Sequence, residues 1–539
     1  MTREQARDVA RGAALVAVPA LLVLWCIALV GHLAIFTEAR YLLDGGRSID
    51  PLRYALLPQL AWGDSRLTGL ATFTLVGGVC GTSPECANLA AAGLTLVAAL
   101  LVLLHAWQVL RSVAFAVVAL LLWGFSPSLL SIWIWHPTWY DLLACILALA
   151  SVSFWWWAFA RPSLSMGARV GVSLVSVLLL MVAFNAKEID YHLVGVIILL
   201  AVVRGATVDG GIQRNLWLTV LPLLYAAWFI GKALLTIDPT YAAETGRRPI
   251  IDGLSLLITQ ALGTSRHFSF LDQQSPLGDA IRNGTAWLFS LFGLALGAAG
   301  IVAALRARPW RRPASFRALL IGWGTEGYLL AIIVVTLVMG ARSSGASAYY
   351  TVIPRWAALL LVLLLIRRAA RSFSRPAWVS AGLVALLAAA GFMGYAGDLA
   401  PGATAPRLVA DSATWRATLA TIDALLDGRD VTNVHWRVDG QPVDAFYLVR
   451  DPAQDQPGTD EPWQPGTDIW RWVVGGDPQV TVEPLLSGTA AEWAARAGEM
   501  AGPGEVLIVT TPEHRLALLA HEGRVLFRGP ETADAGTAP

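Results

Sequence analysis

The sequence predicts a polytopic α-helical membrane protein with about eleven transmembrane helices, followed by a C-terminal extracytoplasmic α/β domain. Hydrophobic residues make up 56% of the 539 positions and charged residues only 14%, which is too apolar for a soluble enzyme. Apolar stretches close to the length of about 20 residues that crosses a bilayer recur as far as Tyr395. After Asp398 the chain becomes polar and is interrupted by Pro and Gly, which is typical of a domain outside the membrane.

Eleven apolar stretches qualify as transmembrane segments. Each must be helical, because lipid offers an exposed backbone no hydrogen bonds. The first stretch is too long for the core of a cleaved signal and lacks a clear cleavage site, so we expect it to be retained. The stretches are 13–35, 87–110, 112–134, 139–159, 169–186, 189–204, 214–235, 285–305, 316–340, 351–367 and 376–396.

Arginines orient the chain, because they gather in alternate connections between these stretches. By the positive-inside rule these connections are cytoplasmic, so the N-terminus lies inside and the segment after Tyr395 lies outside. Abundant Arg, Ala and Gly with scarce Lys indicate a GC-rich bacterial genome, and therefore a bacterial cytoplasmic membrane. The formal net charge is +1 and no basic block indicates a nucleic-acid partner. The outward connections are 36–86, 135–138, 187–188, 236–284 and 341–350.

The four cysteines fall into two groups. Cys26 and Cys145 lie in predicted spans, where we expect them to be packing residues. Cys80 and Cys86 flank the segment GTSPE in an outward connection. They are either two free thiols or a small disulfide-bonded loop, and the oxidising side of the membrane favours the disulfide.

Two domains are expected, 1–397 in the membrane and 398–539 outside it. The second alternates between helical and strand patterns, which predicts a small α/β domain. Ser412 to Leu426 is predicted to be a helix with Asp411 as its N-cap. A second helix is predicted over 489–501, and strands over 431–438, 445–449, 470–474, 479–482, 506–510 and 524–528.

Two outward segments carry clustered ionisable residues. Phe36 to Asp50 contains Glu38 and Asp44, which are either solvated loop residues or the start of a site. Asn185 to Asp190 interrupts an otherwise continuous apolar run. It is either a plain turn between two spans or a functional polar site, since ionisable residues at membrane depth are usually functional.

Five short motifs occur in order along the outward connections. In these motifs the chain resembles the GT-C superfamily of polytopic glycosyltransferases, in particular its protein O-mannosyltransferase-like and tetratricopeptide-bearing members. The resemblance covers roughly residues 10–370. The motifs are Thr37-Glu38-Ala39-Arg40-Tyr41, then Gly81 to Gly93, His136 with Asp141-Leu142-Leu143, Ala186-Lys187-Glu188, and Tyr349-Tyr350 with Pro354.

The chain departs from the family pattern at two positions. Thr37 replaces the first acid of the usual acidic pair, which leaves Glu38 alone. His136 stands where the family usually has arginine. These differences point to a different donor or acceptor, or to impaired catalysis.

The resemblance implies an inverting enzyme that moves a sugar from a polyprenyl-phosphate donor to a hydroxyl acceptor outside the membrane. Such chemistry needs a carboxylate to accept the acceptor's proton and cations to stabilise the departing phosphate. Glu38 is the expected base, Asp44 the reserve, and Asp141 is expected to position groups or bind the sugar. The expected phosphate-binding residues are His136, Lys187, Arg247, Arg248 and Arg342.

No cofactor is obligatory for this chemistry. A divalent metal held by His136, Asp141 and Glu38 is possible but not favoured, because such spacing is common by chance. The expected partners are the lipid-linked sugar donor, a protein, lipid or glycan acceptor, and membrane lipids. The alternatives are a transporter or flippase of a lipid-linked sugar and a non-catalytic cell-envelope scaffold. Inverted repeats would favour the transporter, but none is convincing in this sequence.

Overall fold

The computed structural model divides into two compact units, which are described separately below. The first unit comprises Met1–Leu29, Ser48–Thr72 and Leu89–Pro406, and the second comprises Val30–Arg47, Phe73–Asn88 and Arg407–Pro539. The structure describes residues 3–31, 67–80, 83–134, 138–161, 163–207, 209–236, 276–307, 316–341, 351–400, 404–439, 479–485, 502–511 and 515–529.

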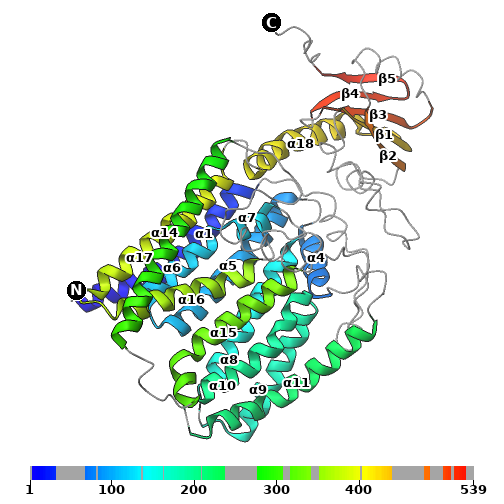
Figure 1. Cartoon of the computed structure of the whole chain (residues 1–539). Helices are drawn as coiled ribbons and strands as arrows, with labels where there is room; N and C mark the ends of the chain where they lie inside the picture. The colour runs from blue at the N-terminus through cyan, green and yellow to red at the C-terminus, as the bar shows by residue number, and fades with distance from the viewer. Residues whose placement is uncertain are drawn as a thin grey trace. The chain divides into compact units, whose positions relative to one another are not determined.

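The first unit is a bundle of apolar helices (Figure 1). A helix or helix pair lies over each of the eleven predicted stretches. The helices are α1 (Arg3–Val30), α5 (Pro84–Leu110), α6 (Val113–Gly124), α7 (Pro127–Ile134), α8 (Trp139–Phe159), α9 (Met166–Phe184), α10 (Leu193–Gly205), α11 (Gly211–Thr236), α14 (Pro276–Ala307), α15 (Phe316–Ala341), α16 (Val352–Ala370) and α17 (Pro376–Asp398), with α4 (Leu67–Cys80) before α5.

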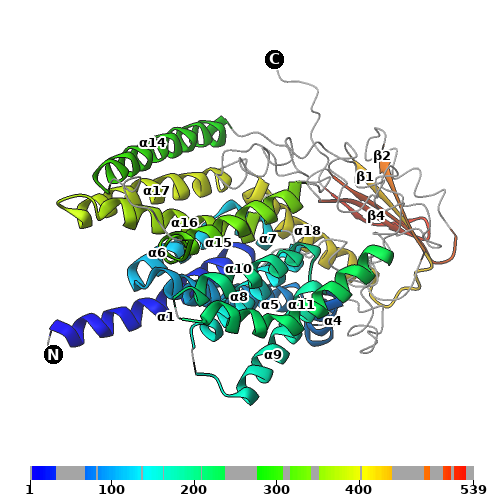
Figure 2. The ribbon, with the colours of Figure 1, turned by 60° about the horizontal axis from the view of Figure 1, so that its bottom comes forward.

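Length and composition confirm the predicted class of polytopic membrane protein. Within the described residues, seven helices are long and apolar enough to cross a membrane. The number rises to eight if α6 and α7, which meet at a bend of 49°, form one broken span. The total of eleven spans stays a prediction. Figure 2 shows α14 beside α17, and α15 packs on α16 and α10 on α11 in the same bundle.

Large aromatic side chains fill the interior of this bundle. Trp133, Trp139 and Trp155 are essentially inaccessible to solvent. A buried indole N–H needs an acceptor, and two of these find a hydroxyl on a neighbouring helix. Trp133 donates to Thr95 at 2.9 Å, and Trp155 donates to Ser176 at 3.0 Å. These bonds fix the positions of the helices that carry them relative to one another.

The second unit contains α18 (Thr404–Leu426) and a five-stranded sheet of order β2-β1-β3-β4-β5. The strands β2, β1 and β3 are parallel, whereas β3, β4 and β5 pair antiparallel. Trp415 of α18 stacks on Trp436 of β1 with ring centroids 5.4 Å apart. The strands are β1 (Asn433–Asp439), β2 (Gln479–Leu485), β3 (Glu505–Thr510), β4 (Leu516–His521) and β5 (Arg524–Arg528).

The predicted strands at 431–438, 479–482, 506–510 and 524–528 correspond to β1, β2, β3 and β5. The strand β4 was missed, because its sequence LALLAH lacks the β-branched and aromatic residues that signal a strand. Pairing with β3 and β5 makes it a strand nonetheless. The prediction for α18 was wrong at its start: the helix begins at Thr404, so Asp411 lies inside it rather than at its N-cap. The ranges 445–449, 470–474 and 489–501 lie outside the described residues.

Candidate functional site

A buried ion pair joins the start of α8 to the segment after α9. The Nζ atom of Lys187 lies 2.5 Å from Oδ1 of Asp141, and the two side chains are only 5% and 3% exposed. Asp141 lies in the first turn of α8, and Lys187 directly precedes the short 3-10 helix η2 (Glu188–His192). The contact therefore brings together two of the five motifs, although 46 positions separate them in the chain.

The backbone between α9 and η2 explains how Lys187 reaches this position. The helix α9 ends at Phe184, and the Nδ2 atom of Asn185 donates to the carbonyl of Met181 at 2.8 Å, which closes the last turn. Lys187 then has an extended backbone, with φ −161° and ψ 147°. This single extended residue separates the two helical segments and allows the lysine side chain to enter the bundle beside α8.

Three polar side chains between Asn185 and Asp190 are shielded from solvent. Asn185, Lys187 and Asp190 are all buried, and Asp190 is completely so. Burying a charge is costly unless the site uses it or compensates it, and ionisable residues among membrane spans are therefore functional candidates. Burial excludes a solvated turn for these three side chains, and a functional role for them stays a prediction.

Further ionisable side chains gather around the pair. Asp190 and His192 on η2 are buried, and η2 packs against α8, α9, α10 and α15. The carboxylates of Asp141 and Asp190 both act electrostatically on the buried thiol of Cys145, one turn further along α8. The site thus combines an ammonium with two carboxylates, a set of groups that can hold a charged ligand and transfer a proton.

The start of α4 is hydrogen-bonded to the end of α9, next to Lys187. The backbone N–H of Thr68 donates to the carbonyl of Asn185 at 3.0 Å, and the Thr68 hydroxyl donates to the carbonyl of Val182 at 2.8 Å. A Cβ atom at Gly69 would overlap the ring of Tyr140, the residue before Asp141. Only glycine lets the α4 backbone approach α8 this closely, so Gly69 helps to place Asp141 against Lys187.

A second buried cation lies where α6 and α7 meet. Arg355, in the first turn of α16, is 8% exposed, and its Nη2 atom lies 3.4 Å from the carbonyl of Leu122 near the end of α6. The buried carboxylate of Asp398 at the end of α17 acts on it electrostatically. The Arg355 guanidinium can therefore donate to a backbone carbonyl near the end of α6. It also adds positive charge to the bundle interior.

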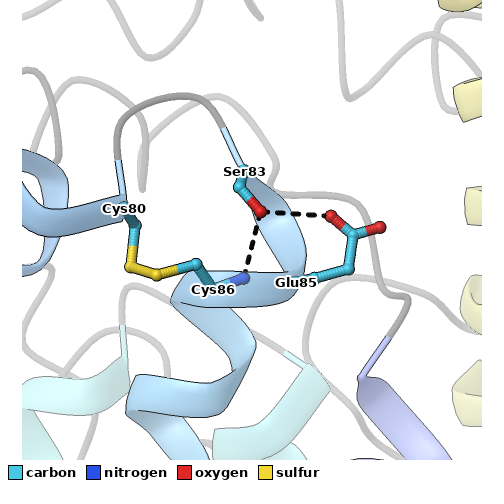
Figure 3. The surroundings of a disulfide bond; sticks show 4 residues. All are labelled: Cys80, Ser83, Glu85 and Cys86. Atoms are coloured by element: carbon cyan, nitrogen blue, oxygen red, sulfur yellow. Dashed lines mark hydrogen bonds between the residues drawn. A yellow bond between two sulfur atoms is a disulfide. The ribbon is translucent and has the colours of Figure 1, made fainter.

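A disulfide joins Cys80, the last residue of α4, to Cys86 in the first turn of α5 (Figure 3). The hydroxyl of Ser83 accepts a hydrogen bond from the backbone N–H of Cys86 at 3.2 Å and donates to Glu85 at 3.3 Å. Glu85 also forms an ion pair with Arg416 of α18. The disulfide and this ion pair together order the start of α5 within the second unit.

Of the predicted catalytic and phosphate-binding residues, the structure describes Asp141 and Lys187 and brings them together. The others lie outside the described residues, and their roles stay predictions. They are the expected base Glu38, its reserve Asp44, and the phosphate-binding candidates His136, Arg247, Arg248 and Arg342.

Sequence reasoning placed Asp190 in a possible polar site without giving it a specific role, and it did not single out His192 or Arg355. Asp190 and His192 follow Lys187 within five positions. Their interruption of the apolar run could have identified both as candidate site residues. Arg355 directly follows Pro354 of the fifth motif, and a charged residue within an apolar span was a signal there as well. Within the described residues no group of three or more His, Cys, Asp and Glu side chains is arranged to hold a metal ion.

The fold and the site define a multi-span helical membrane protein with a buried ion pair between two of its helices and a separate sheet-containing unit. No protein-family model and no curated protein matches the chain. Among solved structures it is similar to the crystal structure of ArnT from Cupriavidus metallidurans bound to undecaprenyl phosphate. The sequence identity is 12%, the match covers 96% of this chain and 98% of that chain, and the TM-score is 0.44.

Proposed function

We propose that the protein is a GT-C-type glycosyltransferase. It moves a sugar from a polyprenyl-phosphate donor to a hydroxyl acceptor at the outer face of the cytoplasmic membrane. The observation that supports this most directly is the buried contact between Lys187 and Asp141. These residues belong to separate motifs of the resemblance, and their contact places a fixed cation inside the bundle, as the proposed chemistry requires.

The proposed reaction is a single displacement at the anomeric carbon. The acceptor oxygen forms a bond to this carbon while the bond from the carbon to the phosphate oxygen breaks. The electron pair leaves with the phosphate, the acceptor proton moves to a carboxylate, and the anomeric configuration inverts. Negative charge grows on the phosphate in the transition state, so a fixed cation there lowers the barrier.

Lys187 supplies such a cation. The carboxylate of Asp141 holds the ammonium in one position, and a preorganised charge needs no rearrangement during the reaction. Because its Oδ1 atom is engaged by Lys187, we assign Asp141 a positioning role. Glu38 remains the proposed base with Asp44 in reserve, and His136, Arg247, Arg248 and Arg342 remain the other proposed phosphate contacts.

The segment 398–539 is proposed to be an extracytoplasmic domain that holds the acceptor, which is a protein, a lipid or a glycan. Only its predicted side of the membrane motivates this role. Deleting the segment and retaining full activity on the native acceptor would remove the role.

Transfer from a labelled polyprenyl-phosphate sugar in proteoliposomes tests the proposed function. Lys187→Met should lower turnover by about 10-fold or more, since a charge-assisted contact contributes roughly 1.5–3 kcal/mol. Lys232→Gln is the matched control, because Lys232 is the other lysine of the chain and is exposed near the end of α11. It should transfer sugar at the normal rate.

Two results would contradict the proposal. Movement of the labelled lipid across the membrane without transfer of its sugar would indicate a transporter. Absence of both transfer and movement, in a correctly folded protein that is offered native cell-envelope acceptors, would indicate a scaffold.

A further inference from the structure

A second cluster of charge lies at the other ends of the helices that carry the Asp141–Lys187 pair. Asp141 is in the first turn of α8, whereas Trp156 is in its last turn, and a rise of about 1.5 Å per residue separates the two by roughly 22 Å. Arg204 lies at the end of α10, one helix length from Lys187. This cluster is therefore distinct from the candidate site.

Arg204 is held in place by an aromatic ring rather than by a carboxylate. Its Cζ atom lies 4.5 Å from the centre of the Trp156 ring. Trp156 is 5% exposed and packs against the buried rings of Tyr328 and His105, with centroids 5.7 Å and 6.0 Å away. The Tyr328 hydroxyl lies 2.7 Å from His105 Nε2, so the support behind Trp156 is itself fixed by hydrogen bonding. The guanidinium is thus preorganised.

Arg204 has no anionic partner among the residues that the structure describes. In the described part of the chain it makes no ion pair, and its buried Nε atom has no hydrogen-bond acceptor. The charge that acts on it most directly is that of Arg111, which repels it. Two guanidinium groups that repel each other, neither of them paired with a carboxylate among the described residues, form a site that an anion would stabilise.

Arg111 occupies a backbone position that favours glycine. It follows the last residue of α5 with φ +51°, and its N–H donates to the carbonyl of Trp107 at 2.9 Å, which is the usual way a left-handed residue ends a helix. Glycine adopts this conformation at no cost, whereas other residues are uncommon there. The conformation therefore carries a backbone cost at Arg111 that glycine would not have.

Arg367 adds a third positive charge beside the same turn. Its Nη1 atom donates to the carbonyl of Leu110, the last residue of α5. The carboxylates described nearby on α15 and after α10 are already engaged: Glu326 pairs with Arg368, and Asp209 pairs with Arg317. Arg111, Arg204 and Arg367 thus form an arginine cluster, and none of the three forms an ion pair with a carboxylate in the described part of the chain.

We propose that the arginine cluster binds the phosphodiester headgroup of an anionic membrane lipid between the ends of α5 and α10. The chemistry fits a lipid, because the neighbouring helices expose long apolar side chains, such as Leu104, Trp107 and Trp157, that acyl chains can cover. Guanidinium groups bind phosphate oxygens through paired N–H donors, and basic clusters between transmembrane helices bind anionic headgroups.

The test uses the full-length protein in a neutral detergent. Thermal unfolding is followed while phosphatidylglycerol, phosphatidylcholine or inorganic phosphate is added, and native mass spectrometry counts the lipids that stay bound. Phosphatidylglycerol should raise the melting temperature in a saturable way, because a ligand that binds only the folded state stabilises it. Phosphatidylcholine and inorganic phosphate should have much smaller effects.

The decisive variants are Arg204→Gln and Arg111→Gly. Each should weaken phosphatidylglycerol binding by about 10-fold or more. Arg111→Gly should also leave the lipid-free melting temperature unchanged or higher, because glycine removes the backbone cost. In this variant lipid binding therefore falls while stability does not. If Arg204→Gln fails to fold, Arg111→Gly still decides the question.

Arg161→Gln is the matched control. Arg161 also stacks on a tryptophan of the same helix end, Trp157, at 4.3 Å, but it is exposed and stands outside the arginine cluster. This variant should bind phosphatidylglycerol normally. Equal protection by phosphatidylcholine, full protection by inorganic phosphate alone, or unchanged binding in both cluster variants would overturn the proposal.

Discussion

Asp141 accepts a hydrogen bond from Lys187 at 2.5 Å in a place where both side chains are shielded from solvent. Removing one partner leaves the other charge buried and alone, which costs about 3–5 kcal/mol, whereas removing both can be nearly neutral. We therefore expect Asp141→Leu and Lys187→Met each to lower thermal stability. The double variant Asp141→Leu with Lys187→Met should recover much of that loss.

Activity separates a structural pair from a functional one. The double variant should remain inactive in sugar transfer even where its melting temperature is restored, because the cation that stabilises the phosphate is gone. Recovery of both stability and turnover would show that the pair serves only the fold. Strictly additive losses in the two single variants and the double variant would show that the two residues are not coupled.

Gly69 and Tyr140 provide a test of the α4–α8 contact. Gly69→Ala places a methyl group into the ring of Tyr140, which is 7% exposed and cannot move away freely. We expect a loss of about 1–3 kcal/mol, as is usual for overpacking, measured as a lower melting temperature. Adding Tyr140→Ala should relieve the clash between the two residues.

Gly93→Ala is the control for that experiment. Gly93 lies within α5, and nothing stands within 4 Å of where its Cβ atom would be. Alanine should stabilise this helix by about 0.5–1 kcal/mol relative to glycine. A Gly69→Ala protein as stable as Gly93→Ala would rule out the close approach of α4 to α8.

The helices of the bundle were predictable, because lipid forces long apolar runs to become helices whatever their neighbours are. The strand β4 was not, since its Leu and Ala residues become a strand only through pairing with β3 and β5. Asp411 shows a related limit: a good N-cap residue followed by a helical pattern does not exclude an earlier helix start.

The candidate site, too, was predictable in its residues but not in their contacts. Asp141 and Lys187 were each predicted from short motifs, but their direct contact depends on how α8 and α9 pack, which no local pattern encodes. Arg355 was missed because its contacts are with Leu122 and Asp398, both far away in the sequence. Residue types can be predicted locally, whereas partners are set by the tertiary structure.

The disulfide between Cys80 and Cys86 should be detectable directly. Alkylation without reductant, followed by mass spectrometry, should leave both residues unlabelled under conditions that protect native bridges. Closing so short a loop contributes about 2 kcal/mol, so Cys80→Ser with Cys86→Ser should lower the melting temperature. Reductant should lower the melting temperature of the wild type and leave the double variant unchanged. Two freely alkylated thiols would contradict the bond.

The orientation of the chain remains a prediction that reporter fusions can test. Arginines in alternate connections predict eleven spans, a cytoplasmic N-terminus and an extracytoplasmic segment after Tyr395. A periplasm-specific reporter fused after residue 398 should be active, and a cytoplasm-specific reporter at the same position should be silent. The same pair of reporters fused near residue 311 should give the reverse pattern. Activity of the 398 fusion only in the cytoplasm would overturn the predicted topology.

Glu38 is the residue on which the proposed chemistry depends most. It follows the first predicted span, and the resemblance implies an essential acid at this turn. If Glu38 is the general base, Glu38→Gln should keep the fold and donor binding but lower turnover by about 100-fold or more. If it only pairs with Arg40 or Arg53 to hold the loop, stability or donor binding should fall together with the rate. Donor affinity, melting temperature and single-turnover transfer measured on one preparation distinguish these outcomes. Near-normal turnover of Glu38→Gln would refute the assignment, and Asp44→Asn would then be the variant expected to lose activity.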